Sequence, residues 1–321
     1  MISRISHNLF DVMTFPLYFW IGFLIFLFTV IALDLGILDR KPKILSFKQA
    51  STLSGIWVLT ASVFGTMIYY YAGRDKALEF FTGYVVELSL SMDNIFVFIM
   101  IFAYFKVPTL YQHRILFWGI LGAIVMRLIM ILGGVYLFSQ FQWIFYVFGI
   151  ILIISGIKIF FTDISSQEVT SVSNGLIRFL KRFVRVSDEL DGHKFFSIRD
   201  NKVYATPLFV CLLLIEKADL IFAIDSIPAI LAITQDTFIV FTSNMFAILG
   251  LRSLYFMLSS ILDRFKYLKY GISMILIFIG IKMLSMMNGH HIPIEYSLLF
   301  ILSVLFSSIA LSFVFTRRYE K

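Results

Sequence analysis

Long apolar segments alternate with short polar stretches along the whole chain. Nine segments are long enough to matter, at about 16–38, 49–72, 79–104, 115–137, 143–161, 206–233, 238–259, 270–287 and 294–315. A helix that crosses a bilayer needs about 20 mostly apolar residues. The pattern therefore predicts an all-α polytopic membrane bundle of nine transmembrane helices, in a single membrane domain covering residues 1–321.

The composition agrees with a chain that has the bilayer as its solvent. Hydrophobic residues make up 60% and charged residues 15%, against about 25% charged in an ordinary soluble domain. These values exclude a soluble enzyme, a disordered protein and a nucleic-acid-binding domain as readings of the whole chain. The expected partner is the lipid bilayer, with no nucleic acid, and a homo-oligomer is left open.

The basic residues are distributed unevenly between the predicted loops. With the amino terminus placed outside, the inner loops hold 19 of the 27 Lys and Arg residues, the outer loops hold three, and five lie within spans. Cytoplasmic loops of membrane proteins carry such an excess. We therefore expect a multi-pass protein of the bacterial inner membrane, with the amino terminus outside and the carboxyl terminus in the cytoplasm.

The one long loop, residues 162–205, is predicted to be cytoplasmic. Residues 174–186 place apolar side chains on one helical face and four basic side chains on the other. That pattern predicts an amphipathic helix lying on the inner leaflet. The following segment predicts a small hairpin that turns at Asp200 and Asn201, and Thr206 followed by Pro207 predicts the start of the sixth span.

The chain contains an internal repeat. The matching segments are ELSLSMDNIFV (87–97) with DLIFAIDSIPA (219–229), ILGAIVMR (120–127) with ILGLR (248–252), and ISGIKIF (154–160) with FIGIKML (278–284). Each unit has three spans, so the second copy is inverted relative to the first. We expect inverted-topology repeats, with repeat A at 79–161 and repeat B at 206–287, an architecture typical of secondary transporters.

Carboxylates inside the predicted spans are the candidate chemistry, because a charge at the bilayer centre costs roughly 2.5–3.5 kcal/mol on the insertion scale. Two neutral oxygen donors stand beside the repeated aspartates. Oxygen ligands favour Mg²⁺, Ca²⁺ or Mn²⁺ over Zn²⁺ or Cu⁺. No permanently bound cofactor is expected. The predicted metal ligands are Asp34, Glu87, Asp93, Asn94, Glu216, Asp219, Asp225 and Ser226.

The alternative is that these acids only neutralise bases within the spans. The five candidates are Arg127, Lys158, Lys217, Arg252 and Lys282. The two arginines could hold the acidic site together as counter-ions or form ordinary ion pairs between helices. The sequence leaves this choice open.

Helical geometry limits how the acids can share one ion. At 100° per residue, Glu87 and Asp93 lie 240° apart around a straight helix, as do Asp219 and Asp225. Either the two members of each pair serve different layers of a pathway, or the helix breaks between them. Pro228 favours a break in the sixth span, because proline removes a helical hydrogen bond and crowds the preceding turn.

The motifs resemble those of the TerC family of bacterial membrane proteins, within it the Alx branch. The resemblance rests on GYVVELSLSMDNIFVF, IEKADLIFAIDSIPAI and TSNMFAILGLRSLYFML, with Asp34 in LDLGILDR, and covers about residues 15–318. The family is associated with manganese export, with pH-responsive expression and, by name, with tellurite resistance. The resemblance implies that the site residues are Glu87, Asp93, Asn94, Glu216, Asp219 and Asp225.

The expected function is a secondary transporter that exports a divalent cation, with manganese favoured. Exchange for protons is attractive, because a crowded, buried carboxylate takes up a proton readily. The alternative is a membrane scaffold or stress-response protein (tellurite, pH or redox) without transport. An enzyme is not expected, and the GxGD signature of intramembrane aspartyl proteases is absent from the sequence.

Overall fold

The computed structural model describes residues 15–38, 45–141, 143–161, 184–187, 190–199, 202–260, 267–287 and 292–319. These residues form an α-helical bundle with one small sheet. The helices are α2 (Leu17–Leu38), α3 (Phe47–Ala72), α4 (Arg74–Tyr104), α5 (Thr109–Gln140), α6 (Ile144–Phe161), α8 (Pro207–Leu231), α9 (Thr237–Ser259), α10 (Leu268–Met287) and α11 (Ile294–Tyr319). Each predicted span corresponds to one of these nine helices.

Seven of the described helices are long and apolar enough to cross a membrane: α3, α4, α5, α6, α9, α10 and α11. In α2 the qualifying apolar stretch is shorter, Leu17–Leu33. Helix α8 carries four charged residues in its interior: Glu216, Lys217, Asp219 and Asp225. The prediction of an all-α, multi-pass membrane bundle is confirmed at this level.

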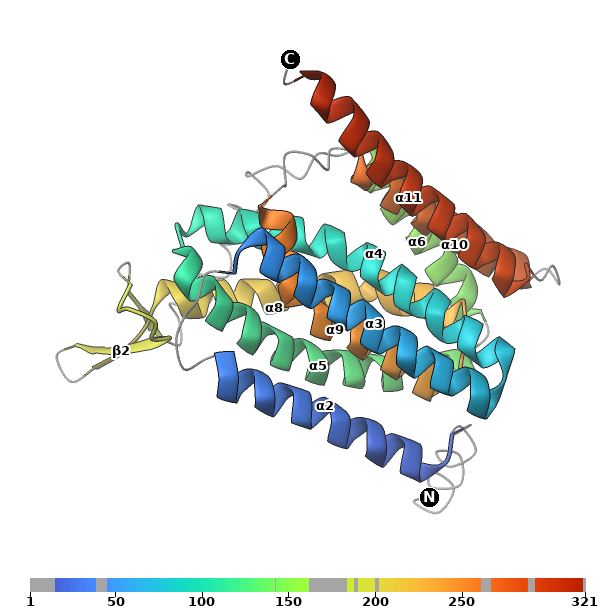
Figure 1. The fold of residues 1–321 in the computed structure, drawn as a ribbon, viewed down its shortest axis with the longest axis horizontal. Helices are drawn as coiled ribbons and strands as arrows, with labels where there is room; N and C mark the ends of the chain where they lie inside the picture. Colours follow the sequence, from blue (N-terminus) through green and yellow to red (C-terminus); the bar gives the residue numbers. More distant parts are fainter. Residues whose placement is uncertain are drawn as a thin grey trace.

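Helix α9 forms the centre of the bundle and is buried along most of its length. It packs against α3, α4 and α5, while α8 packs against α4 and α5. Helices α2 and α11 lie on opposite sides of the bundle (Figure 1). A helix that is apolar all round and enclosed by other helices is typical of a membrane core, so the polar side chains of α9 from Thr242 to Asn244 face protein.

Glycines bring α6 and α10 into close contact. A Cβ atom on Gly156 would lie 2.8 Å from the carbonyl oxygen of Ser273, and one on Gly280 would lie 2.7 Å from the carbonyl oxygen of Gly149. Small residues at membrane-helix interfaces let backbones approach in this way. The two helices therefore meet backbone to backbone.

A three-stranded sheet, ordered β1-β3-β2, projects from one end of the bundle (Figure 1). Strands β2 (Phe196–Arg199) and β3 (Lys202–Ala205) are antiparallel, and Arg199 pairs with Lys202. This confirms the predicted hairpin; its predicted turn residues Asp200 and Asn201 lie outside the described part of the chain. Strand β1 (Arg185–Val186) pairs in parallel with β3.

The amphipathic helix predicted for residues 174–186 falls mostly on residues 174–183, which lie outside the described part of the chain. Its end was placed wrongly, because Arg185 and Val186 are strand residues that extend the sheet next to β3. The backbone of β3 offers hydrogen-bonding groups along its free edge, and pairing with them outweighs helical periodicity for these two residues.

The break predicted at Pro228 is also wrong. Helix α8 runs without interruption from Pro207 to Leu231, with Pro228 inside it. Proline removes one hydrogen bond, but it stands one turn before the helix end, and its own carbonyl accepts a bond from the amide of Ala232 at 3.0 Å. The loss is therefore confined to the last turn. At the other end, Thr206 and Pro207 begin the helix as predicted.

Candidate functional site

A buried arginine contacts polar side chains from three other helices, and together these side chains form a polar layer inside the bundle. Arg127, on α5, is 1% exposed. Its guanidinium pairs with Asp219 of α8 through two bonds, Nη2 to Oδ1 at 2.9 Å and Nε to Oδ2 at 3.3 Å. It also donates to Glu87 of α4 and, at 3.1 Å, to Oδ1 of Asn244 on α9. Bidentate pairing of this kind fixes both charge and orientation.

This Arg127 layer holds more acid than base. With Glu87 and Asp219 ionised and Arg127 charged, the three side chains carry a net charge of −1, and all are buried. Within the part of the chain that the structure describes, one oxygen of Glu87, Oε2, and the amide nitrogen of Asn244 have no hydrogen-bond partner. Unpaired buried polar atoms are costly in a low-dielectric interior, so the layer retains capacity for a further ligand.

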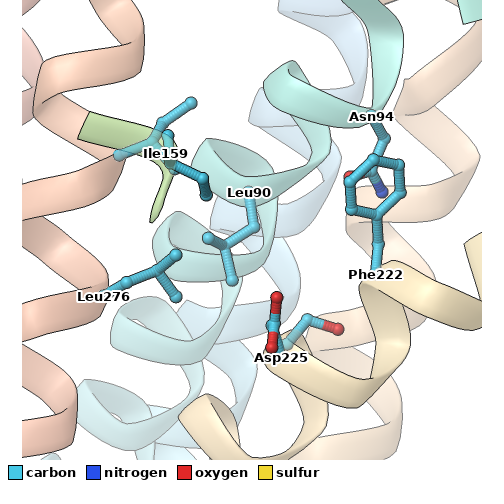
Figure 2. A pocket seen from close by; sticks show the side chains of 8 residues that line it. Leu90, Asn94, Ile159, Phe222, Asp225 and Leu276 are labelled. Carbon is cyan, nitrogen blue, oxygen red and sulfur yellow. The ribbon is translucent and has the colours of Figure 1, made fainter. Parts of the chain in front are cut away.

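A second polar layer surrounds Asp225. Asp225 and Ser226 of α8 line a cavity of about 20 Å³ together with Asn94 of α4. Figure 2 shows Asn94, Phe222 and Asp225 facing this space, with Leu90, Ile159 and Leu276 around it. The hydroxyl of Ser155 on α6 donates to Asp225 at 3.0 Å, and the buried hydroxyl oxygen of Ser226 has no hydrogen-bond partner among the residues described.

This Asp225 layer has the size and chemistry of a small ion site. A cavity of 10–15 Å³ or more can admit a water-sized sphere when polar groups line it. Its lining offers carboxylate, amide and hydroxyl oxygens, which suit hard divalent cations. The layer joins the two matched motifs, because Asn94 comes from the first and Asp225 and Ser226 from the second.

The two layers are separate positions along the bundle. On the unbroken helix α8, Asp219 and Asp225 are six residues apart, which is about 9 Å along the axis and 240° around it. Among the described residues, no three His, Cys, Asp or Glu side chains converge as a metal cluster. Of the two arrangements that the spacing allowed on α8, the structure has the one without a break, in which Asp219 and Asp225 lie in different layers.

The remaining predicted ligands are placed only in part. Glu216 is half-buried, and its carboxylate lies against Gly122 of α5. The side chains of Asp34 and Asp93 lie outside the described part of the chain. Arg252 lines a second small cavity, between α2, α3, α5 and α9.

Two polar residues of these layers escaped the sequence analysis. Asn244 is fully buried and contacts Arg127, and Ser155 contacts Asp225. Asn244 stands in the run Thr242–Asn244, three polar residues within an apolar helix, and that run was a usable signal. A single serine such as Ser155 is common in membrane helices and gave none.

Comparison with known proteins identifies the family of the chain. The model of the integral membrane protein TerC family matches residues 72–320. The chain belongs to the TerC family. No solved structure matches it.

This TerC protein aligns with several relatives over most of its own length and of theirs. An "Uncharacterized membrane protein STKORF319" of Myxococcus xanthus is 46% identical over 298 residues, 93% of this chain and 92% of the relative. An "Uncharacterized membrane protein" of Rickettsia bellii is 47% identical over 264 residues, 82% of this chain and 86% of the relative. A protein of Escherichia coli K12 named "Putative membrane-bound redox modulator Alx" is 43% identical over 305 residues, 92% of each chain.

Proposed function

We propose that this TerC family protein is a secondary transporter that exports a divalent cation, with manganese favoured, in exchange for protons. The observation that carries the proposal is the Asp225 layer, where Asn94 from one motif meets Asp225 and Ser226 from the other. The ligands proposed at this layer are these three side chains, with Asp93 as the matched acid of the first motif. Glu87 and Asp219 are proposed to serve the ion at the other layer, and Glu216 and Asp34 remain predicted ligands.

The proposed architecture is nine spans with inverted repeats. In this scheme α4, α5 and α6 correspond to α8, α9 and α10. The exchange turns a contact between α4 and α9 into one between α8 and α5, and both contacts are present. It also turns a contact between α4 and α10 into one between α8 and α6, and both of these are present as well. An exchange of two such halves is a known route to alternating access.

The contact between α6 and α10 supports the same symmetry. Gly156 and Gly280 are matched positions of the repeat, and Gly149 and Ser273 are matched at the same offset. Gly156 lies against Ser273, and Gly280 lies against Gly149. The crossing therefore repeats itself when the two helices are exchanged, as a two-fold axis requires.

The proposed orientation puts the amino terminus outside the inner membrane and the carboxyl terminus in the cytoplasm. It rests on the 19 basic residues of one set of loops against three of the other, under the positive-inside rule. The small sheet and residues 162–205 then face the cytoplasm.

Transport by the purified full chain in proteoliposomes tests the proposal. We expect Mn²⁺ flux from the parent protein and a loss of about tenfold or more with Asp225→Asn, because the amide keeps the size of the side chain and removes its charge. Asp191→Asn is the control, because that carboxylate lies in the segment between β1 and β2 and pairs with the exposed Lys194. An Asp225→Asn protein with parental flux would remove this layer from the pathway.

The ion pairs of Arg127 favour a second candidate, a membrane scaffold or stress-response protein. Two of the predicted ligands, Glu87 and Asp219, already have a counter-ion. Absence of flux of any divalent cation from the folded parent protein would favour this candidate. A thiol-based redox role is less favoured, because the one cysteine, Cys211, is fully buried in α8.

A further inference from the structure

The Arg127 layer is arranged like a cation site that a side chain occupies. The guanidinium lies between carboxylates of α4 and α8, and it donates one hydrogen bond to the amide oxygen of Asn244. These are the oxygen types that bind a hard dication. All four side chains are almost completely buried. A change of charge at this layer therefore acts on the neighbouring charges with little screening by water.

The layer is unsaturated in two ways. Its net charge is −1 when both acids are ionised, and Oε2 of Glu87 has no hydrogen-bond partner among the described residues although Glu87 is 1% exposed. A purely structural ion pair would be expected to satisfy its buried oxygens, because a half-satisfied buried network costs stability. An uncompensated charge and a free oxygen at the same carboxylate point to a ligand of higher charge than the guanidinium.

We infer that Arg127 is a tethered cation that competes with the transported dication for Glu87 and Asp219, and that this competition selects dications over monovalent cations. The inference rests on the proposed function, and it adds the way in which the transporter distinguishes dications from monovalent cations. Arg127 is thus a specificity-determining residue, which contacts the ligands of the cargo rather than the cargo itself.

Charge explains the selection. Replacing the guanidinium by a dication between the two carboxylates takes the layer from −1 to zero. Replacing it by a monovalent cation leaves the layer at −1, so displacement of the guanidinium brings no gain in charge neutralisation. The displaced guanidinium has a carboxylate at hand on the same two helices, because Glu216 of α8 lies against α5 at Gly122.

Competition also explains how a tightly held ion could leave. When the guanidinium returns to the carboxylates, it replaces the dication with donors that fit both acids. A site without this competitor would bind more tightly and release more slowly. Arg127 would therefore lower affinity and raise turnover together, which is the opposite of what a simple structural ion pair would do.

The test measures Mn²⁺ binding to the purified full chain in detergent. Binding is read from the shift of melting temperature as MnCl₂ is titrated at a constant NaCl concentration. Arg127→Lys keeps the charge and loses the two-pronged fit, so it is a weaker competitor. We expect its apparent Kd for Mn²⁺ to fall about tenfold, equivalent to about 1.4 kcal/mol, while its maximal Mn²⁺ flux in proteoliposomes falls. Lys282→Gln, which removes a buried base bonded to Ser297 instead, should leave both values unchanged.

Arg127→Gln extends the test, because it leaves both acids without a counter-ion. We expect Mn²⁺ binding by this variant to become sensitive to NaCl, since Na⁺ can then enter the layer. If this variant does not fold, Arg127→Lys alone decides the question. Unchanged or weaker Mn²⁺ binding by Arg127→Lys overturns the inference, as does a parent protein that binds no Mn²⁺.

The inference and the proposed function fail in different ways. A parent protein that binds Mn²⁺ without transporting it refutes the transporter, and the comparison of Kd values still decides the role of Arg127. A parent protein that transports Mn²⁺ while Arg127→Lys binds it unchanged refutes only the competition.

Discussion

Replacing Gly156 by alanine should separate α6 from α10 and lower the stability of the bundle. The new Cβ atom would lie 2.7 Å from Cγ1 of Ile277 and 2.8 Å from the carbonyl oxygen of Ser273, whereas ordinary contacts begin at about 3.4 Å. The isoleucine side chain can rotate away, but the carbonyl belongs to the backbone of α10 and cannot. The helices must therefore move apart by about 0.6 Å, which also strains the bond from the Ser273 hydroxyl to the Gly156 carbonyl.

The size of the effect follows from overpacking, which typically costs about 1–3 kcal/mol. Alanine recovers part of this, because it is a better helix former than glycine by roughly 0.8–1.0 kcal/mol. We expect a net loss of about 0–2 kcal/mol in the free energy of unfolding, or a fall in melting temperature of up to roughly 3 °C in detergent.

Gly133→Ala is the matched control, because a Cβ atom at that position of α5 meets nothing within 4 Å. Gly280→Ala should behave like Gly156→Ala, because its Cβ atom would meet the carbonyl oxygen of Gly149 at 2.7 Å. Equal melting temperatures for the Gly156 and Gly133 variants would show that the contact between α6 and α10 yields easily and that the close packing argued here is wrong.

Three further changes test other parts of the molecule. Asp236→Ala should lower the free energy of unfolding by about 1 kcal/mol, measured by thermal melting, because Asp236 caps α9 by accepting bonds from two of its first amides; an unchanged melt would dismiss the cap. Lys202→Cys should resist an impermeant thiol reagent applied outside intact cells, with the native Cys211 silent because it is buried, and ready labelling would reverse the proposed orientation. Ser155→Ala should reduce Mn²⁺ flux several-fold without loss of folding, because its hydroxyl orients Asp225, and parental flux would separate Ser155 from the site.

The helices were predictable because apolar runs of spanning length are a strong signal. Their ends were less so. Helix α4 begins at Arg74 rather than near residue 79, and α5 begins at Thr109 rather than near 115. These first turns are polar and carry their own contacts, as where Lys76 bonds Glu79 at 2.9 Å, so a search for apolar runs omits them.

The site was predictable in its chemistry and less so in its arrangement. The repeated motif identified Glu87, Asp219 and Asp225, and the unbroken helix then placed the two aspartates in different layers. The sequence could not show that α5 turns Arg127 toward two of these acids, because lateral packing between helices leaves no regular pattern in either sequence. The analysis also left Asn244 unnoticed, because Asn244 lies outside the repeated acidic motif, although the polar run Thr242–Asn244 marked it.

The small sheet is coupled to the motion of one particular helix. Strand β3 runs directly into α8, and the hydroxyl of Thr206 at their junction donates to the carbonyls of Lys194 and Phe195. A tilt of α8 would therefore move the sheet with it, and the strand residues farthest from Thr206 would be displaced most. A spin label or fluorophore on β2 would thus report on α8, the helix that carries both Asp219 and Asp225, without touching either polar layer.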